Sequence, residues 1–149
     1  MAGLYHEFFI IEKGSFSPDN YEDYRHKEKV ALHDDILTYF YDTLQWFNSW
    51  NPFTQQSYKG LSLYGVTILQ GETLLKFKRI LSHWRALFSE APSQIVLTGG
   101  FYWIDEELEN GTYERLIYDR EELISLLEKL ISMCEAAHGQ EKEIVHFGI

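Results

Sequence analysis

The feature that most constrains the fold is a β-hairpin signature in the second half of the sequence. The apolar run Ile95-Val96-Leu97-Thr98 predicts a strand over residues 94–104, and residues 112–118 can form the return strand. Between them, the polar segment 105–111 ends in Asn110-Gly111, the dipeptide most typical of tight hairpin turns. Strands joined by so short a connection pair antiparallel. The chain therefore contains at least one antiparallel strand pair.

Helices are predicted wherever apolar residues recur at spacings of three and four. Three segments have this pattern, at residues 20–49, 72–90 and 119–139. The last has the clearest ends, because Asp119 lies three residues before Glu122 in the manner of a capping box and Gly139 suits a C-terminal cap.

Three other segments, 4–12, 58–70 and 143–149, are predicted as strands. The first holds four consecutive apolar residues between charged ones, which is typical of a strand buried on both faces. The second is weakened by glycines. Together with the hairpin, this order predicts an α+β fold, with a mostly antiparallel sheet and about three helices packed on one face. No linker or repeat divides residues 1–149, so we expect a single domain.

The net charge of -10, from 23 acidic against 13 Lys and Arg residues, limits the classes of partner. So acidic a surface repels nucleic-acid backbones and anionic membranes, and it favours a basic protein partner. The single cysteine, Cys134, excludes an internal disulfide and a zinc site built on several cysteines. With no signal-peptide pattern near the N-terminus, these features predict a cytoplasmic protein.

Known catalytic and cofactor motifs are absent from the sequence. Phosphate-binding glycine loops and the H-E-x-x-H zinc motif do not occur, and Ser62 lies between glycines spaced one residue too far apart for a nucleophile elbow. The pair Gly99-Gly100 is better explained by a bulge or close packing than by anion binding. His6 and His146, on the first and last predicted strands, can become neighbours, with a structural role expected. We therefore predict no catalytic residue, no metal and no cofactor.

The hairpin carries the predicted partner-binding residues. They combine acids in the turn with flanking aromatic rings: Trp103, Asp105, Glu106, Glu107, Glu109 and Tyr113. Acids steer a basic partner by long-range attraction, and aromatic rings supply the desolvated anchor of an interface. The alternative is a solvated loop between ordinary strand aromatics.

Two other clusters receive structural interpretations. The first lies where the first predicted helix ends, and we expect it to be core: Trp46, Trp50, Pro52 and Phe53. The second is basic and lies on the second predicted helix, where we expect intramolecular ion pairs or a solvated face: Lys76, Lys78, Arg79 and Arg85.

Three segments, 84–92 (WRALFSEAP), 95–99 (IVLTG) and 144–149 (IVHFGI), resemble the immunity proteins of bacterial polymorphic-toxin systems in general type. The resemblance covers about the last half of the chain and assigns no functional residues. It implies a protein that binds a cognate toxin tightly and blocks it without doing chemistry.

Two other function classes stay open. One is an enzyme acting on a small molecule through carboxylates that only the fold brings together, which predicts a deep pocket lined by buried acids. The other is a subunit or adaptor of a stable complex, which predicts a large apolar patch. The sequence does not set the oligomeric state.

Overall fold

The computed structural model describes residues 4–104 and 110–149, and it has the predicted α+β class. Its strands are β1 (Tyr5–Ile11), β2 (Val30–His33), β3 (Asn48–Asn51), β4 (Gln56–Lys59), β5 (Val66–Leu69), β6 (Gln94–Trp103), β7 (Gly111–Asp119) and β8 (Glu143–Phe147). Its α-helices are α1 (Asp34–Tyr39), α2 (Glu72–Ser89) and α3 (Arg120–Gly139), and its 3₁₀ helices are η1 (Pro18–His26) and η2 (Tyr41–Gln45).

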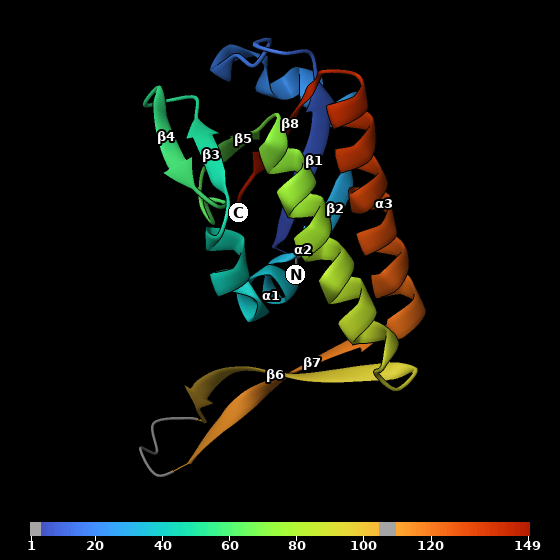
Figure 1. The fold of residues 1–149 in the computed structure, drawn as a ribbon. Helices are drawn as coiled ribbons and strands as arrows, with labels where there is room; N and C mark the ends of the chain where they lie inside the picture. The colour runs from blue at the N-terminus through green and yellow to red at the C-terminus, as the bar shows by residue number, and fades with distance from the viewer. Residues whose placement is uncertain (1–3, 105–109) are drawn as a thin grey trace.

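Within the described residues, six strands form one antiparallel sheet, the main sheet, in the order β2-β1-β8-β5-β3-β4 (Figure 1). Alternation along β1 sends Phe8 to the face covered by α2 and α3, and Phe9 and Ile11 to the opposite face, where Tyr24 of η1 covers them. This confirms the prediction of a first strand buried on both faces. The central strand β8 is buried along its whole length.

The helices contribute to a single apolar core on one face of the main sheet. Side chains of α1, α2 and α3 all join the core cluster that contains Phe8 and Ile144 of the sheet. Asp119 caps α3 as predicted, since its side chain accepts a hydrogen bond of 2.9 Å from the backbone N–H of Glu122. The predicted cap at Gly139 is wrong, because Gly139 is still helical and the left-handed residue beyond α3 is Glu141.

The long helix predicted over residues 20–49 is wrong. The segment instead forms η1, β2, α1 and η2 and enters β3. Val30 and Leu32 alternate into the core as β2 completes the hydrogen bonds at the edge of β1, which outweighs the local helical spacing. The true helix start is at His33, whose Nδ1 accepts from the N–H of Asp35 at 3.1 Å.

The weak strand predicted over residues 58–70 is divided between the end of β4 and β5. Gly60 lies at the break with a φ of +71°, and a Cβ at this position would lie 1.8 Å from the carbonyl oxygen of Leu44. Only glycine fits both the conformation and the space. The predicted hairpin strands and the predicted last strand are present as β6, β7 and β8.

Candidate functional site

The hairpin β6–β7 extends away from the main sheet and α2, at the opposite end from η1 (Figure 1), and we call it the arm. Its base is fixed to the core by the buried side chains of Ile95 and Leu116. The backbone N–H of Arg120 donates to the carbonyl of Ser93 at 2.9 Å, which joins the two ends of the hairpin. The arm is therefore anchored at one end and projects at the other.

A β-bulge in the arm changes which way its side chains point. Pairing passes from Thr98–Arg115 to Phe101–Tyr113, so β6 uses three steps where β7 uses two. The extra residue falls at Gly99-Gly100, as the sequence predicted, and it reverses the alternation of all later residues of β6. Phe101 therefore points away from the face that Ile95 presents to the core.

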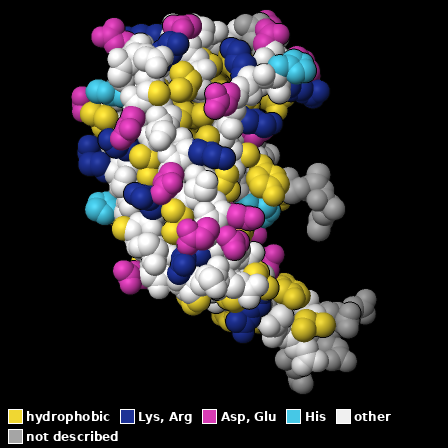
Figure 2. Space-filling model, turned by 90° about the vertical axis from the view of Figure 1, so that its right-hand side faces the viewer, with side chains coloured by type: hydrophobic (Ala, Val, Ile, Leu, Met, Phe, Trp, Pro, Cys, Tyr) yellow, Lys and Arg dark blue, Asp and Glu magenta, His cyan; other side chains and the backbone are white. Residues whose placement is uncertain are grey.

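The reversal gathers five large side chains on the outer face of the arm, which we call the outer stripe: Val96, Phe101, Trp103, Tyr113 and Ile117. Their exposed fractions run from 48% for Val96 to 60% for Ile117. Figure 2 shows apolar side chains exposed along the arm. Exposed apolar clusters of this kind mark interaction surfaces more often than scattered single residues do.

The three rings of the outer stripe hold one another in place. Phe101 makes edge-to-face contacts with Trp103 and Tyr113, at centroid distances of 5.2 and 5.1 Å. Phe101 also lies over Gly111, where a Cβ would come within 2.0 Å of the ring. Between the rings and the aliphatic pair Val96–Ile117 lies the polar pair Thr98–Arg115. Aromatic and arginine side chains are the types that contribute most to binding energy at interfaces.

The structure brings together Trp103 and Tyr113, two of the predicted partner-binding residues, on the outer stripe. The other four, Asp105, Glu106, Glu107 and Glu109, lie outside the described residues. Sequence reasoning missed Val96, Phe101 and Ile117. The signal was present in Gly99-Gly100, because a bulge at this pair reverses the alternation that follows it.

The other two clusters have different outcomes. Trp46 and Phe53, expected in the core, are exposed, because the chain forms η2 and β3 here rather than the end of a long helix. The basic cluster meets the expectation of ion pairs or a solvated face: Lys76 and Arg79 are exposed, and the other two members form ion pairs between α2 and α3. These are Lys78 Nζ with Glu135 Oε1 at 2.7 Å and Arg85 Nη2 with Glu128 Oε1 at 2.9 Å.

The structure also shows that His6 and His146 are neighbours, within a network of polar side chains that ends at the partly exposed Asp34. His6 Nδ1 lies 2.8 Å from His146 Nε2, and His6 Nε2 lies 2.7 Å from Asp34 Oδ1. The Thr67 hydroxyl lies 3.4 Å from His146 Nδ1 and accepts from the N–H of Ser62 at 3.0 Å. These contacts join β1, β8, β5 and the start of α1.

One arrangement of hydrogens satisfies every hydrogen bond of this side-chain network with both imidazoles neutral. The Asp34 carboxylate only accepts, so His6 donates from Nε2 and its Nδ1 accepts from Nε2–H of His146. The Thr67 hydroxyl then donates to Nδ1 of His146. Burial is the main cause that lowers the pKa of both histidines, well below the ordinary value for His146.

The histidine pair of this network is closed to solvent, whereas Asp34 at its end is partly exposed. Thr67, His146 and His6 are each at most 1% exposed. The role of the network is to satisfy polar groups inside the core and to fix the pairing of β1, β8 and β5. The thiol of Cys134 is unsuited to chemistry, because burial raises its pKa to about 12.

No family model, curated protein or solved structure matches the chain. Among residues 4–104 and 110–149, no three His, Cys, Asp or Glu side chains are grouped so that they could hold a metal ion. In the same residues, every helix is too short or too polar to cross a membrane.

Proposed function

We propose that the protein is an inhibitor of the immunity type, which binds a basic protein partner, such as a cognate toxin, through the outer stripe of the arm. The observation that carries the proposal is the exposure of five large apolar side chains on one face of a projecting hairpin. An isolated two-stranded ribbon is only marginally stable in water, and burial of this face against a partner would stabilise it.

The ring contacts within the outer stripe support a docking role. Phe101, Trp103 and Tyr113 already contact one another, so binding would order fewer side chains than it would on a loose surface. Preorganised rings next to an arginine-containing pair match the composition of interface hot spots.

The charge of the chain supports a basic partner. A net charge of -10 attracts a positively charged protein over several ångströms and raises its association rate, most strongly at low salt. The sequence also places four acids, Asp105, Glu106, Glu107 and Glu109, between Trp103 and Tyr113. The proposal includes the cytoplasmic location that the sequence predicts.

A permanent subunit of a larger complex is the second candidate, and the apolar character of the outer stripe favours it. The two proposals differ in kinetics. An inhibitor that finds its target by charge associates more slowly as salt rises, whereas a subunit assembled through apolar burial shows a weak salt dependence.

The test uses the product of the gene adjacent to this one, expressed with and without the present chain in a bacterial host. We expect the chain to bind that product and to restore growth if the product is toxic. The double substitution Trp103→Ala and Tyr113→Ala should weaken binding about 30-fold or more, because both rings are proposed hot spots. Tyr64→Ala, at a ring that is 79% exposed and far from the arm in the sequence, is the matched control. Equal binding by all three proteins would exclude the outer stripe.

A further inference from the structure

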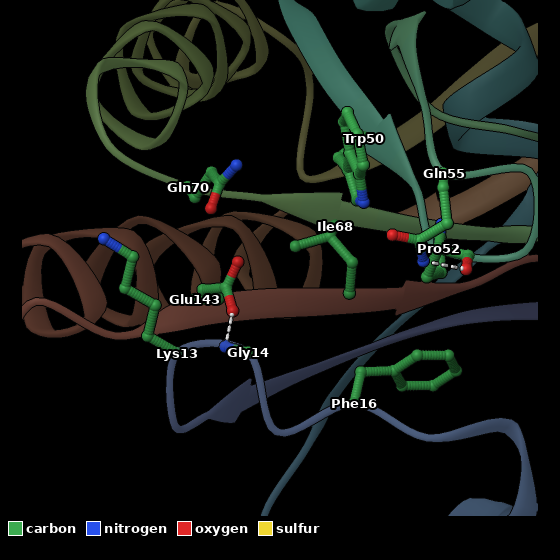
Figure 3. A pocket seen from close by; sticks show the side chains of 9 residues that line it. All are labelled: Lys13, Gly14, Phe16, Trp50, Pro52, Gln55, Ile68, Gln70 and Glu143. Carbon is green, nitrogen blue, oxygen red and sulfur yellow. Dashed lines mark hydrogen bonds between the residues drawn. The ribbon is translucent and has the colours of Figure 1, made fainter.

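A separate pocket of about 270 Å³ opens on the face of the main sheet opposite α2 and α3 (Figure 3). Ile68 of β5 and Glu143 of β8 form its floor. Trp50 of β3 and Phe16, from the loop after β1, stand on opposite sides, with Pro52 beside them. The pocket is too small for a nucleotide-sized ligand. Its lining combines two rings, Trp50 and Phe16, with the polar side chains of Lys13, Gln55, Gln70 and Glu143.

Glu143 is a buried carboxylate that faces this pocket. Alternation along β8 places it on the same face as Val145 and Phe147, and only 6% of the residue is exposed. The N–H of Gly14 donates to its Oε1. Oε2 has no hydrogen bond or ion pair with the residues that the structure describes, and in Figure 3 it points away from Gly14 into the pocket. Oε2 is open to the pocket, so a bound cation would pair with it without displacing a protein donor.

The two aromatic rings of the pocket also favour a cation. Trp has the strongest cation-binding ring face, and the Trp50 ring borders the space in front of Glu143. Phe16 supplies a second ring, held edge-to-face by Phe53 at a centroid distance of 6.1 Å. Mg²⁺ or Ca²⁺ would need about six or more oxygen ligands, and one carboxylate does not provide them.

We propose that this pocket binds a small organic ammonium ion. The positive nitrogen lies against Oε2 of Glu143, and its alkyl groups contact Trp50 and Phe16. Lys13 also lines the pocket, and its positive charge opposes the binding of a cation there. The pocket lies near the start of β8, away from the arm, and this inference does not rest on the proposed function.

The experiment titrates the full chain with choline and with 3,3-dimethylbutan-1-ol, its uncharged isostere, and follows the indole N–H resonance of Trp50 by NMR, assigned from Trp50→Phe. We expect saturable binding of choline and binding at least about tenfold weaker for the alcohol. A blocked lysine, Nα-acetyl-lysine-N-methylamide, is titrated in parallel. Comparing its affinity with that of choline shows whether the pocket prefers a small-molecule ammonium ion or a lysine side chain.

Three variants test the assignment. Glu143→Gln keeps an acceptor for Gly14 and should weaken choline binding about tenfold, whereas Glu90→Gln, the same charge change on the exposed end of α2, should not. Lys13→Gln should tighten binding. Thermal unfolding of each variant checks that the fold is intact. Equal binding of choline and its isostere, no saturable binding of any ammonium probe, or unchanged choline affinity in a folded Glu143→Gln protein would each overturn the proposal.

Discussion

Acidification should destabilise this protein well above the pH at which carboxylates titrate, because His6 and His146 are buried as neutral rings. Both pKa values are lowered from 6.5 in the folded state, mainly by burial. Below about pH 6.5 the unfolded chain therefore binds protons that the folded chain does not, and stability falls as pH falls. The loss continues until the folded pKa of each ring is reached.

The magnitude follows from the two protons. Each pH unit below about 6.5 removes up to about 1.4 kcal/mol for each histidine that stays neutral in the fold. Two such rings give a limit of about 2.7 kcal/mol per unit, a large part of the stability of an ordinary domain, about 5–15 kcal/mol. The loss should appear as a lower urea midpoint at about pH 5.5 than at about pH 7.5.

The variant His146→Leu isolates the contribution of the buried pair. It removes one of the two protons, so the slope of stability against pH should fall by about half. At about pH 7.5 the variant should also be less stable by about 1–3 kcal/mol, because His6 and Thr67 each lose a hydrogen-bond partner. Urea unfolding at both pH values measures both effects. A parent protein of constant stability over this range, or a variant with the same slope as the parent, would refute the reasoning.

Two other predictions concern single positions. Gly60→Ala should destabilise the fold by about 3 kcal/mol, because the new Cβ meets the carbonyl oxygen of Leu44 and the backbone has a positive φ. Gly139→Ala, in open space on α3, is the control and should stabilise by about 0.5–1 kcal/mol in the same urea unfolding assay. Cys134, whose pKa burial raises to about 12, should react with a thiol reagent only at the rate of unfolding, and rapid labelling of the native protein would contradict its burial.

Local sequence patterns correctly predicted the hairpin and the start of α3. The hairpin was predicted from two apolar runs with Asn110-Gly111 between them, although in the structure Gly111 pairs with Trp103 and the carbonyl of Asn110 accepts from the N–H of Ile104. The start of α3 follows from Asp119. The helix predicted over residues 20–49 failed because β2 pairs with the edge of β1, and sequence spacing does not report that long-range pairing. The sequence analysis overlooked His33, which precedes two aspartates and caps a helix start, because His33 also fitted the apolar spacing of the predicted long helix.

The candidate sites were less accessible to sequence reasoning because they depend on register. Trp103 and Tyr113 were predicted from the sequence as partner-binding residues, but their grouping with Val96 and Ile117 depends on one bulge. The pocket at Glu143 brings together β3, β5, β8 and the loop after β1, which are far apart in the sequence. Local pattern therefore indicated where rings occur but not which of them share a face.

Because of the bulge, a change of one residue in strand length can alter which side chains the outer face of the arm presents. Inserting one codon beside Glu114 in β7 would give both strands three steps, turn the distal half of the hairpin over and present Tyr102 and Thr112 in place of Phe101, Trp103 and Tyr113. The main sheet and its core would be unaffected, because Ile95 and Leu116 anchor the arm before the bulge. A lineage carrying this fold can thus exchange the chemistry at its tip through a single change of length, while the body of the molecule stays the same.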